Sequence, residues 1–471
     1  MEQKQIMMSK KITIIGSGPG GYVAAIRASQ LGFAVTVVER SELGGVCLNW
    51  GCIPTKSLLK SAEVFNYTKN AAHYGIDVEG TVTPNFEKVI QRSRQIASQM
   101  SKGIEYLFTK NAINVIKGTA TIKDNQTVSV KGNDGVDSDI SSDYIILATG
   151  ARSRSLPTLP IDGKTIIGYK EALCLPTLPK TMLVVGSGAI GVEMAYFYAS
   201  MGTQVTIVEY MSSIVPLLDQ DVSDPLERSL KKLKVKVLKD SEVLSVVKNE
   251  LTNTVTVKTP KGEIAVEAEI ILSAVGIEAN CDGLGLSEIG VEIQKGKIVV
   301  DSQYKTTIDS IYAIGDIIAT PALAHVASAE ALACVELLAG HNKKAINYQA
   351  IPSCIYTSPE ISSVGLTENQ LKQQNIPYTI GKFPFSALGK ATAVGARDGF
   401  VKLLFDAATN KLLGAHMVGY NVTEMLSEIV LGLNLGATAH DFLESIHPHP
   451  TMSEAIMEAA AVACGEAIHL G

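Results

Sequence analysis

The chain has 471 residues, of which 46% are hydrophobic and 19% are charged, and its formal net charge is -6 at pH 7. This length exceeds the size at which one hydrophobic core stops growing, so we expect two to four domains. The acidic balance, without a long run of Lys or Arg, argues against nucleic acid as a ligand. No window approaches the roughly eighteen apolar residues of a membrane span.

A short polar leader, Met1–Lys11, opens the chain. It has neither the apolar core of a signal peptide nor the Arg-rich amphipathic pattern of a transit peptide. We therefore expect a cytoplasmic protein that works where it is made and has no membrane partner.

A β-α-β unit follows the leader. Lys11–Ile15 is a β-rich apolar run, an Ala-rich helical stretch extends to about Gly32, and Ala34–Val38 is a second run that ends at Glu39. The turn between the first run and the helix carries three glycines in the pattern GxGxxG: Gly16, Gly18 and Gly21. In dinucleotide-binding units these glycines permit the tight turn, the approach of backbone to a pyrophosphate and close helix–strand packing. One such turn is weak evidence, because many α/β proteins have glycine-rich turns without a ligand.

A pair of cysteines comes next, since Cys47 follows Glu39 by eight residues and Cys52 lies five residues further on. In a regular helix, residues five apart are rotated by roughly 140° and raised by roughly 7.5 Å, beyond the roughly 7 Å limit for the Cα atoms of a disulfide. The backbone between the two cysteines must therefore be distorted or turned if they pair. Pro54 agrees, because it disfavours helical geometry at Ile53 and suits the first turn of a helix through Ser57–Tyr67.

A metal site, or two unrelated thiols, is the alternative interpretation of this pair. Zinc would need two further ligands from a short Cys/His cluster, and none is visible nearby, so we expect no metal. Five other cysteines stand alone in surroundings where a buried thiol is the usual explanation. They are Cys174, Cys281, Cys334, Cys354 and Cys464.

A second β-α-β unit repeats the first. Met182–Val185 runs into another glycine-rich turn, a helix extends to about Gly202, and Val205–Val208 ends at Glu209. The three glycines of this turn are Gly186, Gly188 and Gly191. Each acid lies 23 residues beyond the first glycine of its turn, and this shared register strengthens the case for two nucleotide sites. Glu39 and Glu209 should accept hydrogen bonds from ribose hydroxyls, and a carboxylate at this place repels the extra phosphate of NADP, which favours NAD.

Near the C-terminus, His447 and His449 precede Glu454 and an Ala-rich helix. A thiol is mostly protonated at neutral pH and reacts as its thiolate, so an enzyme that oxidises dithiols needs a base beside its substrate. The imidazole of His449 can take the proton, and Glu454 can orient the ring. Alternatively, Glu454 complements a helix N-terminus and His449 is a turn residue.

The redox segment, Gly44–Lys56, contains every fixed element of the pattern GGxCxNxGCxPxK. Through this segment the chain resembles the pyridine nucleotide-disulfide oxidoreductases, over essentially its whole length after the leader. The resemblance implies bound FAD, with Cys47 as the thiol that exchanges with substrate and Cys52 facing the isoalloxazine. The position of the cysteines after the first unit implies FAD there and NAD at the second. Lys56 is implied to lie near the flavin and to pair with Glu193, although sequence alone favours a solvated lysine.

Further positions match those that contact the two cofactors in this family, although each alone would be an ordinary strand-end turn. For FAD they are Gly118, then Ala148, Thr149 and Gly150 after the strand Tyr144–Leu147, then Asp316, and then Ala322, Leu323, Ala324 and His325. The resemblance places Asp316 to hydrogen-bond the ribityl chain. For NAD they are Val243 and Gly276. Many relatives carry an arginine after this last glycine, whereas this chain has Ile277, so the contacts of that arginine are not carried over.

The resemblance implies an α/β fold with two Rossmann-like dinucleotide-binding domains and a C-terminal α+β dimerisation domain. We expect an FAD-binding domain (1–150), an NAD-binding domain (151–278), a central segment that returns to the FAD domain (279–350) and an interface domain (351–471). The last contains the expected strands Phe400–Phe405 and Leu412–Val418. In the implied homodimer, each active site combines the cysteines of one subunit with His449 and Glu454 of the other.

Within the family, the chain looks like the enzymes that oxidise protein-bound dihydrolipoamide and reduce NAD to NADH. The implied partners are lipoyl domains and the E2 core of 2-oxo acid dehydrogenase complexes, or the H protein of glycine cleavage. Glutathione reductase is the runner-up, but it usually has a different pair of residues before the lysine and cationic residues that recognise NADP, whereas Pro54-Thr55-Lys56 and Glu209 favour lipoamide and NAD. Mercuric reductase is less favoured because the C-terminus carries Cys464 alone. A mainly structural flavoprotein subunit is the non-enzymatic alternative, and the retained cysteines with His449 and Glu454 argue against it.

Overall fold

The computed structural model describes residues 10–470, which fall into two compact units. Unit 1 comprises residues 10–57, 90–154 and 276–346, and unit 2 comprises 58–89, 155–275 and 347–470. The first two boundaries fall within α4 (Cys52–Lys69) and α5 (Phe86–Lys110). The four-part division expected from the sequence is finer than these units and stays a prediction. Most of the leader lies outside the described residues.

Unit 1 is built on a seven-stranded sheet with the order β19-β6-β1-β2-β3-β4-β5. β1 (Lys11–Ile15) lies between β2 (Ala34–Glu39) and β6 (Tyr144–Leu147) and is parallel to both. Their side chains are mostly buried, which explains why the three strands are nearly continuous apolar runs. The other strands of the sheet are β3 (Asn114–Ile122), β4 (Thr127–Gly132), β5 (Asp137–Ser141) and β19 (Ile311–Ala313).

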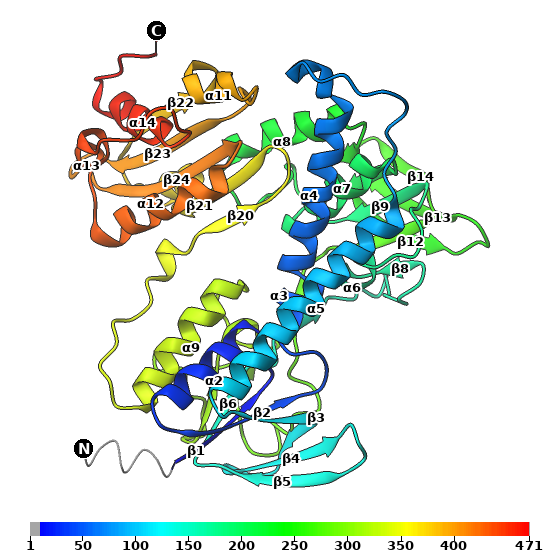
Figure 1. Cartoon of the computed structure of the whole chain (residues 1–471), viewed down its shortest axis with the longest axis vertical. Helices are drawn as coiled ribbons and strands as arrows, with labels where there is room; N and C mark the ends of the chain where they lie inside the picture. Colours follow the sequence, from blue (N-terminus) through cyan, green and yellow to red (C-terminus); the bar gives the residue numbers. More distant parts are fainter. Residues whose placement is uncertain (1–9, 471) are drawn as a thin grey trace. The chain divides into compact units, whose positions relative to one another are not determined.

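Two helices rich in small residues, α2 (Pro19–Gln30) and α9 (Ala324–Leu338), pack against each other in unit 1 (Figure 1). Both begin at loops that follow strands of the sheet, so their N-termini belong to its carboxyl edge, where α/β proteins bind ligands. The smaller elements of unit 1 are α3 (Gly45–Trp50), β7 (Ala151–Ser153), β16 (Ile277–Ala279), β17 (Ile293–Gln294), β18 (Lys297–Ile298) and η2 (Gly315–Ile317).

Unit 2 contains a second parallel sheet, with the order β11-β10-β9-β15-β8. β9 (Thr181–Val185) lies between β10 (Gln204–Val208) and β15 (Ile270–Ser273), as β1 lies between its two neighbours in unit 1. The helix after β9, α7 (Ala189–Met201), is apolar on all sides and almost wholly buried. The accompanying elements are η1 (Ala71–Tyr74), β8 (Ile166–Ile167), α6 (Tyr169–Ala172), α8 (Gln220–Lys232), β11 (Lys236–Leu238), β12 (Glu242–Val247), β13 (Asn253–Thr259) and β14 (Gly262–Ala268).

The C-terminal part of unit 2 is a five-stranded antiparallel sheet with the order β20-β21-β24-β23-β22. Its central strands, β23 (Phe400–Asp406) and β24 (Leu412–Gly419), are buried on both faces, and α14 (Glu454–Cys464) packs on β22 (Tyr378–Pro384). The remaining elements are η3 (Tyr348–Ala350), β20 (Ser353–Ile355), β21 (Glu360–Gly365), α10 (Glu368–Gln373), η4 (Phe385–Ala387), α11 (Gly389–Ala393), α12 (Val422–Leu435) and α13 (Ala439–Glu444).

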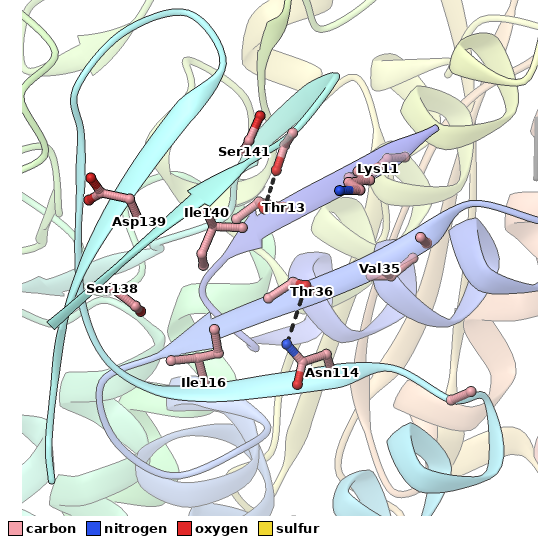
Figure 2. Close-up of a pocket in the computed structure, with 14 residues that line it drawn as sticks. Lys11, Thr13, Val35, Thr36, Asn114, Ile116, Ser138, Asp139, Ile140 and Ser141 are labelled. Carbon is pink, nitrogen blue, oxygen red and sulfur yellow. Dashed lines mark hydrogen bonds between the residues drawn. The ribbon is translucent and has the colours of Figure 1, made fainter. Parts of the chain in front are cut away.

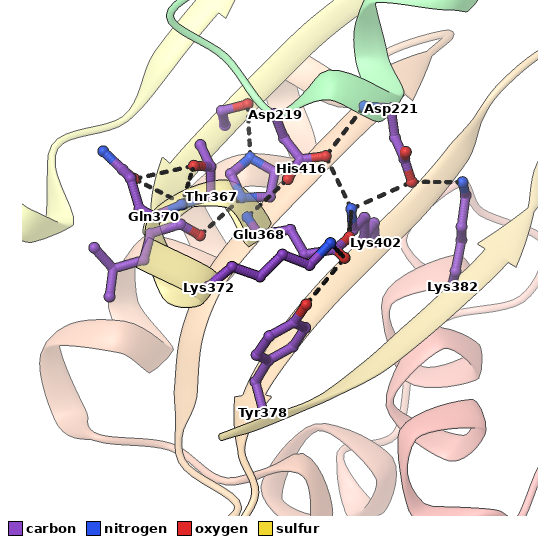
Figure 3. Close-up of polar contacts among 12 residues, drawn as sticks. Asp219, Asp221, Thr367, Glu368, Gln370, Lys372, Tyr378, Lys382, Lys402 and His416 are labelled. Atoms are coloured by element: carbon purple, nitrogen blue, oxygen red, sulfur yellow. Dashed lines mark hydrogen bonds and ion pairs between the residues drawn. The ribbon is translucent and has the colours of Figure 1, made fainter. Parts of the chain in front are cut away.

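A buried ionic cluster joins α8 to this C-terminal sheet (Figure 3). The side chain of Lys402, in β23, is 1% exposed, and its Nζ lies 2.9 Å from Asp219, 3.2 Å from Asp221 and 2.7 Å from Glu368. Although burial opposes the charge, the carboxylates raise the pKa of Lys402 to about 12. Asp219 also caps the N-terminus of α8, so the cluster fixes this helix against the sheet.

The expected strands and helices of the two β-α-β units are confirmed, and two local expectations are wrong. Ile53 is helical, because α4 begins at Cys52 and Pro54 stands in its first turn, where a backbone N–H has no helical partner. Of the five isolated cysteines, only Cys334 is buried. Cys174 is exposed because it follows the short helix α6 at the surface. Within residues 10–470, no helix is long and apolar enough to cross a membrane.

Candidate active site

The first glycine turn (Gly16–Gly21) is closed by contacts that only glycine allows. Gly16 has φ +98°, and a Cβ there would lie 2.4 Å from the carbonyl oxygen of Ala148. A Cβ on Gly21 would lie 1.9 Å from the carbonyl oxygen of Gly16. The turn therefore presses its backbone against β6 and against the first turn of α2, and this leaves the helix N-terminus open to a phosphate.

Glu39 lies beneath this turn and holds it. One carboxylate oxygen accepts the N–H of Ser17 at 2.8 Å and its hydroxyl at 2.7 Å, and the other accepts the N–H of Ser41 at 2.9 Å. The carboxylate is nearly buried. Since an ionised carboxylate has about four acceptor sites, Glu39 can hold the turn and still accept a ribose hydroxyl.

The second glycine turn (Gly186–Gly191) repeats this arrangement in unit 2. Gly186 has φ +97°, and a Cβ there would lie 2.4 Å from the carbonyl oxygen of Ala274. Glu209 accepts the N–H of Ser187 at 2.8 Å and its hydroxyl at 2.5 Å, and accepts the N–H of Met211 at 2.7 Å. Two turns with the same strain and the same buried acid fit two dinucleotides, which agrees with one FAD site and one NAD site.

The redox segment breaks between two helices. α3 ends at Trp50, Gly51 has φ -145° and ψ -116°, and α4 begins at Cys52. This break is the backbone distortion that the spacing of the cysteines predicted. A hydrogen bond with the Cys52 thiol, together with burial, raises the pKa of Cys47, and the positive charge of Lys56 opposes this rise. The two thiols are thus in contact, with a lysine close enough to stabilise a thiolate.

The redox segment lies directly on the first glycine turn. The N–H of Gly44 donates to the carbonyl oxygen of Ser17 at 3.1 Å. A Cβ on Gly45 would come within 2.6 Å of the Cα of Gly18. The cysteine pair is therefore tied to the nucleotide turn of unit 1, which supports the expectation that this turn serves FAD.

Several expected flavin contacts gather at the carboxyl edge of the unit 1 sheet. Thr149 and Asn280 hold each other: the Thr149 hydroxyl donates to the Asn280 carbonyl at 2.9 Å, and the Asn280 amide donates to the Thr149 carbonyl at 2.9 Å. Sequence reasoning did not find Asn280, which carries no motif. Gly118 pairs with Gly132 of β4, and a Cβ on it would lie 2.5 Å from the Lys131 carbonyl, so sheet packing alone also requires this glycine.

Asp316 lies in η2, just before α9. Burial raises the pKa of its carboxyl, and the charge of Lys297 opposes this rise. The N–H of the preceding residue, Gly315, donates at 2.7 Å to Glu330, whose side chain is fully buried in α9. Sequence reasoning missed Glu330, although an acid among the small apolar residues of α9 was a signal. The expected stretch Ala322–His325 forms the start of α9, with Leu323 at its N-cap.

The expected NAD contacts do not all belong to one unit. The side chain of Val243 is buried in the core of unit 2, so only its backbone is available to a ligand. Gly276 has φ +111° and belongs to unit 1, where its carbonyl accepts the N–H of Arg154 at 3.0 Å. Lys56 belongs to unit 1 and Glu193 to unit 2, and their pairing stays a prediction. Within unit 2, Glu193 accepts the N–H of Tyr356 at 2.9 Å.

The strand that follows Gly276 has an arginine beside it. Ile277, which stands where many relatives have arginine, lies in β16, and β16 pairs with β7. Arg152 of β7 lies opposite Glu278 and contacts it at 2.8 Å, and it contacts Asp282 at 2.6 Å. One cation of this region, Arg152, therefore lies on the neighbouring strand, where the sequence pattern did not indicate it.

His449 and Glu454 are in contact. Nδ1 of His449 lies 2.8 Å from Oε1 of Glu454, and the other oxygen of Glu454 accepts the N–H of Thr451 at 2.7 Å. Although burial acts in the opposite direction, these contacts lower the pKa of Glu454. The side chain of His449 is 76% exposed. A proton on Nδ1, held by the carboxylate, leaves Nε2 as the acceptor on an accessible ring.

The neighbouring histidine, His447, differs from His449 in its hydrogen-bond partners. Nε2 of His447 lies 2.9 Å from Glu428 and its Nδ1 lies 2.8 Å from the carbonyl of Ser445. The hydrogen bond to Glu428 raises the pKa of His447 despite burial. Both ring nitrogens of His447 therefore face acceptors, whereas in His449 only Nδ1 does, so His449 is the better placed of the two to accept a proton.

A pocket of about 520 Å³ in unit 1 lies away from the first glycine turn (Figure 2). It is lined by the first residues of β1 and β2, such as Lys11 and Thr36, and by β5. It therefore belongs to the amino edge of the parallel strands, whereas the first glycine turn follows their carboxyl edge. In residues 10–470, no group of three or more His, Cys, Asp or Glu could hold a metal ion.

Comparisons with known proteins agree with this geometry. The family model described as pyridine nucleotide-disulphide oxidoreductase matches residues 10–331, and the dimerisation domain of the same family matches residues 351–460. The chain is 43% identical to a dihydrolipoyl dehydrogenase of Zymomonas mobilis, covering 97% of this chain and 98% of the relative. It is 42% identical to a dihydrolipoyl dehydrogenase of Bacillus subtilis, with 97% and 98% covered.

Solved structures are similar over the same length. LpdA from Mycobacterium tuberculosis superposes with a TM-score of 0.89 at 26% identity, covering 96% of this chain and 99% of that one. The HOCl-induced flavoprotein disulfide reductase RclA from Escherichia coli superposes with a TM-score of 0.84 at 25% identity, with 96% and 99% covered.

Proposed function

Since the chain belongs to the pyridine nucleotide-disulphide oxidoreductase family, we propose that it oxidises protein-bound dihydrolipoamide to lipoamide and reduces NAD to NADH. The observation that carries this proposal is the contact between Cys47 and Cys52 at a break between two helices that lies on the first glycine turn. The names of its relatives, at 42–43% identity over nearly the whole chain, support lipoamide as the substrate.

The cofactors are FAD and NAD. Unit 1 holds FAD with the first glycine turn, Glu39 and Asp316, and unit 2 holds NAD with the second glycine turn and Glu209. When bound, FAD would supply the two-electron transfer between the cysteine pair and NAD. The protein supplies the backbone cradle, the buried carboxylates and the position of the thiols.

In the thiol steps, His449 takes a proton from the substrate dithiol through Nε2, and Glu454 stabilises the imidazolium. The substrate thiolate attacks the sulfur of Cys47 in the Cys47–Cys52 disulfide. An S–S bond to the substrate forms, and Cys52 leaves as a thiolate, stabilised by the charge of Lys56. The second substrate thiol, deprotonated in turn, attacks the first substrate sulfur, closes the lipoamide ring and releases Cys47.

The chain acts as a homodimer, because residues 351–460 match the family's dimerisation domain. We propose that each active site is shared, with Cys47 and Cys52 from one subunit and His449 and Glu454 from the other, since an isologous interface creates two equal sites. Apolar side chains support an interface on this domain: Leu431 and Leu435 of α12 and Ile446 are strongly exposed in the single chain. The partners are lipoyl domains and the E2 core of 2-oxo acid dehydrogenase complexes, or the glycine cleavage H protein, and the site of action is the cytoplasm.

A mixed dimer tests the shared site. A Cys47→Ser chain is combined with a His449→Ala chain, each with its own tag, and the doubly tagged dimer is purified. If sites are shared, one site carries both lesions and the other is intact, so about half of the wild-type activity returns. If His449 acts in its own chain, each site keeps one lesion and the mixed dimer stays as poor as its parents.

The purified protein, loaded with FAD, tests the reaction itself. We expect NADH to form from NAD when dihydrolipoamide is supplied, and NADP to be a poor substitute. Reduction of oxidised glutathione by NADPH at a higher kcat/KM would instead identify the glutathione reductase alternative. Absence of both activities in FAD-loaded protein would favour the remaining alternative, a mainly structural flavoprotein subunit.

A further inference from the structure

Three consecutive residues of α5 contact the redox segment, or Ser57 directly after it, within unit 1. Arg92 Nη1 donates to the hydroxyl of Ser57 at 2.8 Å and to its carbonyl at 3.2 Å. The buried hydroxyl of Ser93 donates to the carbonyl of Pro54 at 3.2 Å. The guanidinium carbon of Arg94 lies 4.4 Å from the centre of the Trp50 ring.

These contacts fall on both sides of the break at Gly51. Trp50 is the last residue of α3, whereas Pro54 and Ser57 belong to the first turns of α4. The orientation of α3 relative to α4 is set by the two backbone dihedrals of Gly51, a residue with unusually wide conformational freedom. Because Cys47 lies on α3 and Cys52 on α4, that orientation also sets the distance between the two sulfurs.

Trp50 is held at its face and at its edge. Arg94 covers the face of the ring, and the Nε1–H donates to Glu42 at 3.4 Å. The Nε and Nη2 atoms of Arg94 are buried. A cation–π contact is strongest with tryptophan and strengthens when the cation is partly desolvated, so this stack opposes rotation of the ring about Gly51.

On the α3 side, three further hydrogen bonds continue the support. The hydroxyl of Ser101, two turns further along α5, donates to the carbonyl of Leu43 at 2.9 Å. The buried amide of Asn49 donates to the same carbonyl at 2.9 Å and to that of Gly45 at 3.1 Å. Helix α5 therefore contacts Leu43 just before the redox segment, Trp50 at the break and Pro54 after the second cysteine.

We propose that Arg94 is a positioning residue for the Cys47/Cys52 pair, acting through its stack on Trp50 to hold the break at Gly51 in the geometry that lets the disulfide close. This inference rests on the proposed redox role of the pair. A pair whose sulfurs are held close forms its disulfide at a high effective concentration, and this stabilises the disulfide against the dithiol. Loosening the break lowers that effective concentration and makes the disulfide easier to reduce.

The test measures the thiol–disulfide equilibrium of the FAD-loaded protein with dithiothreitol, without dihydrolipoamide or NAD. In this exchange, the Cys47–Cys52 disulfide and dithiothreitol give two cysteine thiols and cyclic oxidised dithiothreitol. Anaerobic alkylation then counts the remaining thiols. We expect Arg94→Gln to lower the equilibrium constant for disulfide formation by about tenfold, which makes the reduction potential about 30 mV more positive.

Three matched variants separate positioning from a general effect of charge or stability. Arg94→Lys keeps a cation for the ring and should restore most of the equilibrium constant. Lys102→Gln removes an exposed charge from the same helix and should leave it at the wild-type value. In a Trp50→Leu background, Arg94→Gln should have no further effect, because the contact through which it acts is gone.

An equilibrium constant unchanged by Arg94→Gln, an equal shift in Lys102→Gln, or a full further shift in the Trp50→Leu background would each overturn the inference. If Arg94→Gln does not retain FAD, Trp50→Phe is the second variant. It keeps a ring with a weaker face and should shift the equilibrium by about threefold, and no shift in that variant overturns the proposal. Because the measurement uses no dihydrolipoamide, it can be interpreted even if the proposed function is wrong.

Discussion

The two glycine turns share their local geometry and differ in what lies on them. Gly16 and Gly186 have nearly the same φ, +98° and +97°, and each turn is held by an acid that accepts one serine through both its N–H and its hydroxyl. On the first turn, the redox segment packs so closely that a Cβ on Gly45 would meet the Cα of Gly18 at 2.6 Å. At the second turn, the N–H of Val215 donates to the carbonyl oxygen of Ser187 at 3.2 Å, as Gly44 does to Ser17 at the first turn, but a Cβ on Gly188 would have no close non-neighbouring contact within 4 Å.

This difference teaches how one scaffold serves two roles. The turn itself supplies only a phosphate cradle and a ribose acceptor, which suit any dinucleotide. The neighbouring segment decides the chemistry: the segment on the first turn carries Cys47 and Cys52, whereas the segment that contacts the second turn through Val215 carries no cysteine. Four pairs of substitutions test whether the two turns have these separate roles.

The largest effect is expected from the thiols. Cys47→Ser and Cys52→Ser should each abolish dihydrolipoamide oxidation, because each thiol has its own step, while FAD remains bound to the first turn. The measurement is NADH formation together with the visible absorbance of the flavin. Substantial turnover in either FAD-loaded variant would sink the disulfide mechanism.

Replacing the first glycine of each turn with alanine should weaken the binding of one cofactor at a time. Gly16→Ala forces a Cβ against the Ala148 carbonyl and should weaken FAD binding by about a hundredfold or more, whereas Gly186→Ala should leave FAD bound and weaken NAD binding by a similar factor. Flavin absorbance and titration with NADH measure the two affinities. Loss of FAD from a folded Gly186→Ala protein would reverse the assignment of the turns.

Glu209 should set the choice of nicotinamide nucleotide. Glu209→Gln keeps the size of the side chain and an acceptor for Ser187, but removes the negative charge that repels the extra phosphate of NADP. We expect KM for NAD to rise by about tenfold and KM for NADP to change much less. The matched variant Glu39→Gln should leave the NAD/NADP ratio of kcat/KM unaltered, and an equal change in both variants would contradict this role.

The smallest effect is expected from the serine hydroxyls beneath the turns. Ser187→Ala removes one hydrogen bond to Glu209 and should raise KM for NAD by about threefold to tenfold, whereas Ser17→Ala should weaken FAD retention and leave KM for NAD unchanged. Steady-state kinetics and the rate of FAD loss on dilution provide the two values. Identical responses of the two variants would mean that the turns are not independent.

Much of this arrangement could be predicted from the sequence, because it depends on local patterns. The glycine spacing predicted both turns, and the five-residue spacing of the cysteines predicted a backbone distortion between them, which the structure places at Gly51. For His449 and Glu454 the sequence left two alternatives open, and their direct contact was one of them. In each case one short segment carries the information.

What the sequence could not show depends on segments that are distant in the chain. The buried Glu330 that accepts the N–H of Gly315, the Thr149–Asn280 pair and the stack of Arg94 on Trp50 join residues 15 to 131 positions apart. Ile53 was misjudged for a different reason, since the rule that a residue before proline avoids helix is weakest in a helix's first turn.

The most direct test of the account follows the two half-reactions of Gly186→Ala separately. The FAD-loaded variant is mixed rapidly with dihydrolipoamide without NAD, and the reduction of the protein is followed by absorbance. The account predicts reduction at the wild-type rate, because the thiols and the first turn are intact, together with loss of NADH formation at ordinary NAD concentrations. Slow reduction by dihydrolipoamide in a folded, FAD-loaded variant would contradict the division of the reaction between the two turns.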